Sequence, residues 1–126
     1  MINAKATSDY GLFVETYEKF YSQHQAELGH YFRLLYNVIK LVKSKALSDQ
    51  HLYTNLVRAQ LSSAELKLLF YNCITRWGRD KFKPLVEEFA LLKTVPEERV
   101  PAPELFRQYQ PAAFGGQYPE RWLRIA

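Results

Sequence analysis

The chain has 126 residues, a formal net charge of +4 and a single cysteine. This length supports one hydrophobic core, so we expect one domain. One cysteine excludes a domain held together by disulfides, and Cys73 is expected to be a small buried side chain because it lies in an apolar segment. The mild positive charge is scattered along the chain, which favours a solvated surface over a dedicated nucleic-acid groove, and we predict no DNA partner.

The sequence contains no uninterrupted apolar run of about 18 residues, the length that a membrane-spanning helix needs. Its first residues, Met-Ile-Asn-Ala-Lys-Ala, lack the apolar stretch of a signal peptide. We therefore expect a cytoplasmic protein with no membrane span in this chain. If the chain is part of a longer protein, we expect it at the inner face of the membrane.

Apolar residues recur at helical spacing through most of the chain, and no alternating pattern of useful length predicts a strand. Residues 1–8 are small and polar, and we expect them to form a flexible leader. An aromatic stripe then predicts a helix over about 9–26. Gly29 marks either a break or a close approach between helices, and a second helix leads from it to a charged loop over 43–48.

The middle of the chain carries the clearest local signal. A third helix follows the loop and is expected to end between residues 58 and 61. The tetrapeptide Ser62-Ser63-Ala64-Glu65 has the form of a capping box, in which the glutamate returns to the amide of the capping serine. We therefore expect a fourth helix from the serine to about Trp77, with Gly78 as a left-handed terminator.

Two charged features flank this fourth helix. Arg58 closes the third helix and is placed to pair with Glu65 across the corner. After the fourth helix, a basic stretch leads to Pro84, which suits the first turn of a fifth helix that runs to about Leu92.

Proline-rich sequence begins at residue 94 and excludes a long helix in the last third of the chain. A short helical turn is expected over 103–109, and aromatic anchors should hold the rest against the surface: Phe106, Tyr109, Phe114 and Trp122. The predicted fold is all-α, a compact bundle of about five helices over 9–93 with an irregular C-terminal wrap over 94–126.

Two sets of polar residues are candidates for a functional site. His30 and Arg33 are three residues apart and share one helix face, where histidine would act as acid or base and arginine as an anion clamp. A solvated helix face is the alternative. Further along, four polar residues are embedded in the most apolar run, so they are expected to be partly buried and to need polar partners: Arg58, Gln60, Glu65 and Asn72.

The signatures of common enzymes are absent from the sequence. Its three histidines and one cysteine do not have zinc-ligand spacing, and there is no glycine-rich phosphate loop. Glu87 and Glu88 are adjacent on a predicted helix and point apart, so they cannot form a catalytic dyad. We expect no metal and no cofactor, and the sequence leaves open whether the protein is an enzyme.

Three ordered segments carry a resemblance to a known family. They are Gly29-His30-Tyr31-Phe32-Arg33-x-Leu35-Tyr36, Tyr53-Thr54-Asn55-Leu56-Val57-Arg58-Ala59-Gln60-Leu61-Ser62, and Glu65 with Leu69-Phe70-Tyr71-Asn72-Cys73. Together with a block from Gly78 to Lys93, they resemble the putative phage abortive infection proteins, an AbiC-like family of bacterial defence genes. The resemblance covers about residues 13–114.

The resemblance implies a role in stopping phage propagation. Longer relatives carry membrane-spanning segments before this region, which this chain lacks. The resemblance also marks the polar positions of the motif as candidate site residues: His30, Arg33, Arg58, Gln60, Ser62, Glu65, Tyr71 and Asn72. Tyr36 from the first segment is a further candidate.

Three functions are compatible with these residues. The protein is a defence effector or sensor that binds a phage or host protein through the polar motif, or it is an RNA-cleaving toxin of the HEPN type. HEPN toxins place an arginine four to six residues before a histidine, which this sequence lacks, so such a site would have to combine His30, Arg33 and Arg58 from different helices. The third function is a helical protein-interaction module without catalysis, whose polar motif is a structural network.

Aromatic residues suggest two further properties. The chain has nine tyrosines and eight phenylalanines, and this surplus makes a homo-oligomer plausible. A lipid or small-ligand pocket lined by tyrosines between helices is a further alternative.

Overall fold

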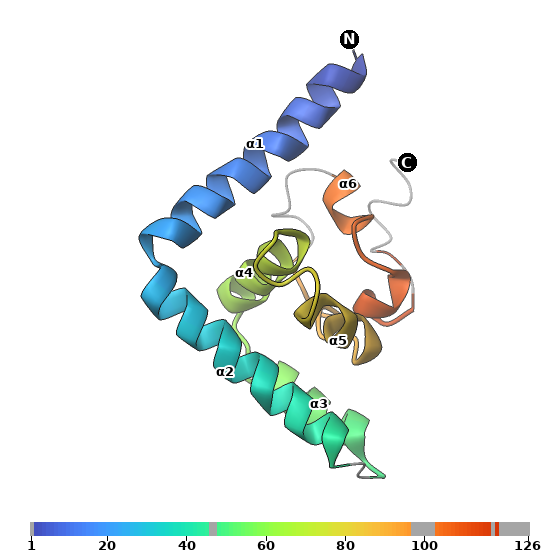
Figure 1. Ribbon diagram of the computed structural model, residues 1–126. Helices are drawn as coiled ribbons and strands as arrows, with labels where there is room; N and C mark the ends of the chain where they lie inside the picture. The colour runs from blue at the N-terminus through green and yellow to red at the C-terminus, as the bar shows by residue number, and fades with distance from the viewer. Residues whose placement is uncertain (1, 46–47, 97–102, 117, 119–126) are drawn as a thin grey trace.

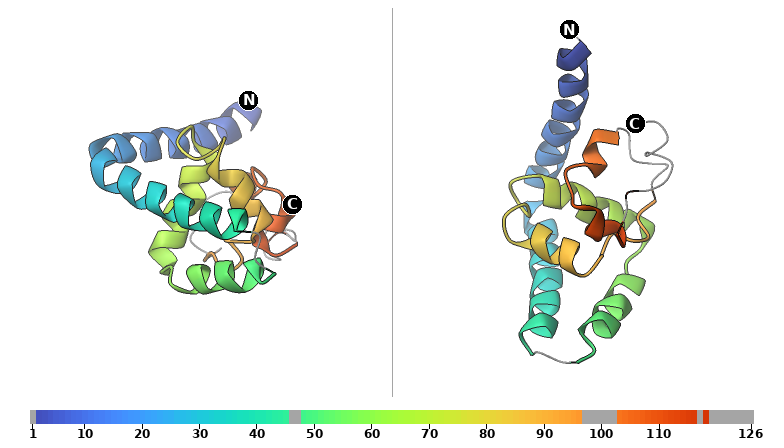
Figure 2. Two further views of the ribbon diagram at one scale, coloured as in Figure 1. Left: turned by 60° about the horizontal axis from the view of Figure 1, so that its bottom comes forward. Right: turned by 90° about the vertical axis from the view of Figure 1, so that its right-hand side faces the viewer.

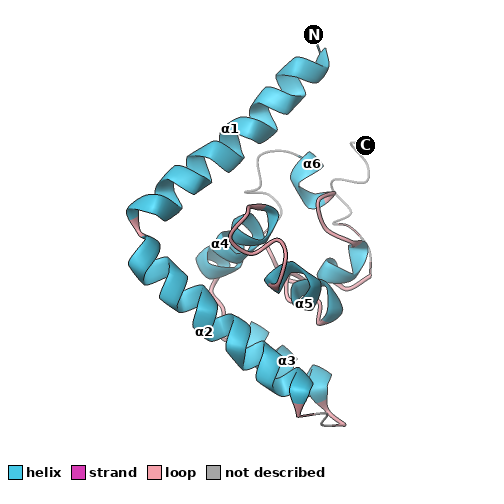
Figure 3. Cartoon of the chain, viewed as in Figure 1, coloured by secondary structure: helices cyan, strands magenta, loops and turns pink. Residues whose placement is uncertain are grey.

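The computed structural model describes residues 2–45, 48–96, 103–116 and 118. These residues form helices and no strand, so the all-α prediction is confirmed (Figure 3). In chain order the elements are α1 (Ile2–Gln23), α2 (Gln25–Ser44), α3 (Gln50–Ala59), α4 (Ser63–Ile74), α5 (Phe82–Glu88), α6 (Pro103–Phe106) and the 3-10 helix η2 (Pro111–Phe114).

The two longest helices form a bent arm around the rest of the domain. α1 and α2 meet at His24 and enclose α4 and α5, while the N-terminal half of α1 extends past the other helices (Figure 1). α3 runs antiparallel to α2 and contacts it (Figure 2). The C-terminal elements α6 and η2 cover the other side of α4 and α5.

Helix α4 lies at the centre of the core because almost every face of it is covered. Leu69, Phe70 and Cys73 have no solvent exposure, and α1 and α5 contact the helix. Burial raises the pKa of the Cys73 thiol, so the thiol stays protonated and unreactive. The prediction that Cys73 is a small buried side chain is confirmed.

The first two helices differ from their predicted bounds. α1 begins at Ile2, because residues 2–8 include two alanines and no glycine or proline, and the backbone continues the helix. Gly29 lies inside α2 and marks a close approach, since a Cβ atom there would be 3.2 Å from the Tyr21 hydroxyl. The division into a leader over 1–8, a bundle over 9–93 and a wrap over 94–126 stays a prediction.

Helices α4 and α5 both end earlier than the sequence predicts. α4 ends at Ile74, where Thr75 turns extended and its hydroxyl donates to the Asn72 carbonyl at 2.8 Å. α5 ends at Glu88, because Ala90 takes a left-handed conformation with a φ of 51° that a helix cannot continue.

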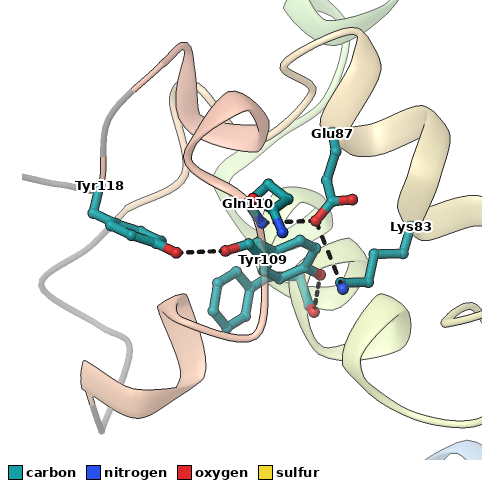
Figure 4. Close-up of polar contacts among 6 residues, drawn as sticks. Lys83, Glu87, Tyr109, Gln110 and Tyr118 are labelled. Carbon is teal, nitrogen blue, oxygen red and sulfur yellow. Dashed lines mark hydrogen bonds and ion pairs between the residues drawn. The ribbon is translucent and has the colours of Figure 1, made fainter.

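Hydrogen bonds join the C-terminal segment to the bundle and link parts of the segment to each other (Figure 4). The Tyr109 hydroxyl donates to the Phe70 carbonyl at 2.5 Å, and the Tyr118 hydroxyl donates to the Tyr109 carbonyl at 2.7 Å. Glu87 accepts from the Gln110 backbone N–H at 2.7 Å. The aromatic anchors expected here are buried, namely Phe106, Tyr109 and Phe114, while Trp122 lies outside the described residues.

Replacing Tyr109 with phenylalanine removes the hydroxyl that joins this segment to α4. We expect Tyr109→Phe to lower the free energy of unfolding by about 1 kcal/mol, the net value of a buried hydrogen bond. Tyr53→Phe is the control, because the Tyr53 side chain is exposed. Chemical denaturation measures both variants, and equal stability of Tyr109→Phe and wild type would contradict the expectation.

Candidate functional site

A cleft of about 420 Å³ opens between the end of α1, one flank of α2 and the connection from α4 to α5. We call it the Arg33 cleft. Its volume lies within the range of about 300–1,000 Å³ that is usual for small-ligand sites. The lining residues are Tyr21, Gly29, Phe32, Arg33, Tyr36, Asn37, Asn72, Trp77, Gly78, Lys81 and Phe82.

Asn72 is the buried polar residue of the cleft, with 2% of its surface exposed. Its side-chain Nδ2 donates to the Tyr17 hydroxyl of α1 at 3.1 Å. Its backbone carbonyl accepts from the Thr75 hydroxyl and, at 3.2 Å, from the Gly78 backbone N–H. Burial raises the pKa of Tyr17, so this hydroxyl stays neutral beside the amide.

Position 78 requires a glycine because the chain passes close to Asn72 there, and not because its backbone is left-handed. Only Gly115 and Gly116 have positive φ angles among the described glycines, so the prediction that Gly78 is a left-handed terminator is wrong. A Cβ atom at Gly78 would collide with the Asn72 side-chain oxygen. The α4–α5 connection can therefore pass against Asn72 only because residue 78 has no side chain.

Two pairs of aromatic rings form part of the wall of the Arg33 cleft. Trp77 stacks on Tyr21 with ring centroids 4.3 Å apart and an interplanar angle of 20°. Tyr36 meets Phe82 edge to face at 5.6 Å. Burial raises the pKa of the Tyr21 hydroxyl, and the positive charge of Arg33 acts in the opposite direction.

The charged residues that line the cleft are positive. Arg33 and Lys81 line it, both are exposed, and neither has an ion pair among the residues that the structure describes. Lys40 lies 5.8 Å from the ring centre of Tyr36, and Arg76, which pairs with Glu18 at 3.9 Å, lies 4.6 Å from that of Trp77. No aspartate or glutamate is among the lining residues. The cleft therefore suits an anionic group.

A second group of motif residues forms the corner between α3 and α4. The capping box is confirmed: Ser62 Oγ accepts from the Glu65 backbone N–H at 3.1 Å, and Glu65 Oε1 accepts from the Ser62 backbone N–H at 2.9 Å. The Tyr31 hydroxyl of α2 donates to Glu65 Oε2 at 2.8 Å. The Ser62 backbone bond and then the Tyr31 hydroxyl lower the pKa of the Glu65 carboxyl.

Arg58 does not pair with Glu65, so that expectation is wrong. Its Nη1 donates to the Ala90 carbonyl at 3.3 Å instead, at the turn that ends α5. Gln60 is exposed where α3 ends, so the expectation that it is partly buried is wrong. His30 is exposed on α2 and is not among the lining residues of the Arg33 cleft.

The structure thus divides the residues predicted for a site among several places. Arg33, Tyr36 and Asn72 meet in the cleft, whereas Arg58 contacts the end of α5. Tyr71 lines a separate groove between α1 and α4 of about 560 Å³, which also contains Tyr17. Tyr21, Trp77 and Lys81 are cleft residues that the sequence did not indicate, and their only signal was aromatic or basic character near the predicted helix ends.

Comparison with known proteins gives one family. The model of the family described as "Putative phage abortive infection protein" matches residues 23–100, which is more than half of the chain. The chain belongs to this family. No curated protein and no solved structure matches it.

The match covers α2 to α5 and therefore the lining residues of the Arg33 cleft other than Tyr21. Abortive infection is thus the biological context in which the cleft is interpreted. Among the described residues, no group of three or more histidine, cysteine, aspartate or glutamate side chains could hold a metal ion. No helix in the described part combines the length and apolar character that crossing a membrane requires.

Adding a methyl group at Gly78 tests the contact with Asn72 in this abortive infection protein. We expect Gly78→Ala to destabilise the fold by about 1–3 kcal/mol, as overpacked sites do. Gly11→Ala is the matched control, because nothing lies within 4 Å of a Cβ atom there. That change should leave stability equal or raise it by up to about 1 kcal/mol, since Gly11 lies within α1. Thermal melting measures both, and a loss of the same size in each would refute the close contact.

The pH dependence of stability tests whether the charge of Glu65 stabilises the corner between α3 and α4. The folded state lowers the pKa of Glu65 below its ordinary value of 4.5, so the charge stabilises the fold above that pH. This stabilisation is lost as the pH falls through the lowered pKa. We expect Glu65→Gln to cost about 0.3–1 kcal/mol at neutral pH, the usual value of a charge at a helix N-terminus.

In acid, the melting temperatures of Glu65→Gln and wild type should converge. Glu15→Gln is the control because the Glu15 side chain is exposed on α1. A difference between Glu65→Gln and wild type that stays constant with pH would show that the charge of Glu65 has no role.

Proposed function

We propose that this protein acts in phage abortive infection as a sensor or effector that binds a phosphate-bearing ligand in the Arg33 cleft. The observation that supports this proposal is the composition of the cleft wall. Two exposed cations without ion pairs among the described residues, Arg33 and Lys81, line it beside aromatic rings that include Tyr36, and no acidic residue lines it.

Each lining group suits part of a nucleotide. The planar guanidinium of Arg33 can hold two phosphate oxygens at once, and Lys81 adds a second positive charge. Tyr36 is a ring on which a base can stack, an interaction of about 1–3 kcal/mol per base in single-strand binding proteins, whereas Trp77 already has Tyr21 and Arg76 against its ring. Asn37 is exposed and offers an amide donor and acceptor. The ligand class is therefore a free nucleotide or one nucleotide of an RNA strand.

Binding is favoured over RNA cleavage by the placement of the candidate catalytic residues. A cleavage site needs a group that moves a proton within hydrogen-bond reach of the phosphate. His30 does not line the cleft, and Arg58 is bonded to the end of α5. The HEPN-like alternative would require these side chains to gather at Arg33, so we propose recognition of the ligand without cleavage.

The cleft cations can be removed one at a time. Arg33→Ala and Lys81→Ala should each weaken binding about tenfold, the effect of losing one charged contact of about 1.4 kcal/mol. They should also reduce protection of bacteria against phage. Arg107→Ala and Lys19→Ala are the controls, because both side chains are exposed and neither lines the cleft.

Two measurements are made on each variant after its melting temperature has been compared with that of wild type. The first is the plaque-forming efficiency of a phage panel on bacteria that express the gene. The second is the binding of a fluorescein-labelled single-stranded RNA and of a labelled adenine nucleotide to the purified protein, at several salt concentrations. RNA binding without nucleotide binding identifies an RNA ligand, and the reverse identifies a free nucleotide. Unchanged plaque formation and binding in both cleft variants would overturn the proposal.

A further inference from the structure

Helix α2 exposes a line of large apolar side chains. Leu34 and Leu41 are 59% and 55% exposed, and Val38 between them is also exposed. Steps of four and three residues separate them, the spacing of a seam between two packed helices. We call Leu34, Val38 and Leu41 the α2 stripe.

The exposed apolar residues of α3 lie on the same outer face. On α2, Tyr36 and Lys43 contact Phe82 and Glu88 of α5, and the α2 stripe lies on the opposite flank. On α3, His51 and Arg58 contact Phe89 and Ala90 after α5, and the exposed residues again lie opposite, namely Leu52, Tyr53 and Leu56. Because α2 and α3 contact each other, the two sets together make an apolar surface that faces away from the core.

Such a surface indicates a partner. Monomeric proteins rarely expose contiguous apolar patches larger than a few hundred Å². An antiparallel helix pair with an exposed apolar face can bury that face against a second pair and so complete a four-helix arrangement.

The charges at the two ends of the stripe identify the partner as a second copy. The same alternation of four and three residues continues through half-buried Tyr31 to Glu27 at one end and to Lys45 at the other. Both charged residues are exposed, and neither has an ion pair in the described ranges. The stripe therefore begins with a negative charge and ends with a positive one.

An antiparallel pairing of two copies satisfies these charges and the apolar residues in one register. When Glu27 lies opposite Lys45 of the second copy, Leu34 lies opposite Val38 and Tyr31 lies opposite Leu41. A parallel pairing would instead bring like charges together at both ends. The antiparallel arrangement has a two-fold axis, which is the commonest symmetry of protein dimers.

We propose that this protein forms a two-fold symmetric homodimer through the α2 stripe, with Glu27 of each copy paired with Lys45 of the other. The proposal goes beyond the proposed function and does not depend on it. Arg33 precedes Leu34 and so lies about a quarter turn around α2 from the stripe. The dimer accordingly leaves the Arg33 cleft open.

Molar mass measured by sedimentation equilibrium tests the surface. Wild type should be a dimer that dissociates on dilution. Leu34→Asp should shift it to monomer without loss of the cooperative melt, because the side chain is exposed. Leu12→Asp is the matched control, since Leu12 is 58% exposed on α1 and lies outside the surface, and it should stay dimeric. A wild type that is monomeric at all concentrations would overturn the proposal and leave the surface to a different partner.

Exchanging the end charges tests the register. Glu27→Lys and Lys45→Glu should each weaken the dimer about tenfold at low salt, because two attractions become two repulsions. An equal mixture of the two variants should dimerise as tightly as wild type. In the mixed pair the introduced lysine faces the introduced glutamate, and the two native charges face each other. A mixture no tighter than the separate variants would overturn the antiparallel register.

Discussion

The buried amide of Asn72 is the constraint on which the arrangement of this domain depends. The side-chain Nδ2 of Asn72 donates to Tyr17 of α1, and the backbone carbonyl of the same residue accepts from the Thr75 hydroxyl and the Gly78 backbone N–H. A buried amide without partners would cost the fold several kcal/mol, so these contacts must form together. The position of α1, the end of α4 and the path of the following connection are thereby coupled.

The Arg33 cleft is a consequence of this coupling. Once the chain turns at Thr75 and passes against Asn72 at Gly78, Trp77 stacks on Tyr21 of α1 and Lys81 faces α2. Aromatic and cationic side chains that are far apart in the sequence thus meet because one buried side chain is satisfied.

The sequence predicts what local chemistry decides and misses what distant contacts decide. The capping box at Ser62 and the burial of Cys73 follow from short patterns, and both are observed. Gly78 looks like a left-handed terminator from its neighbours, yet its role comes from the Asn72 side chain. Arg58 is near Glu65 in the sequence, but its side chain donates a hydrogen bond to the Ala90 carbonyl, 32 residues away. For the cleft, the charge of Arg33 on a helix face is visible in the sequence. Trp77 continues the helical spacing of the fourth helix, so its place in the α4–α5 connection could not be predicted from the pattern.

Helix α2 carries three different tasks on three flanks. One flank buries Phe32, Leu35 and Ile39 in the core, one carries Arg33 and Tyr36 into the cleft, and one presents the α2 stripe. Consecutive residues of a helix are about 100° apart, so Arg33 and Leu34 belong to different surfaces but cannot move independently. A ligand that displaces α2 when it binds in the cleft would also displace the stripe. Binding and dimerisation would then be linked reciprocally, because each could favour the same position of one rigid helix.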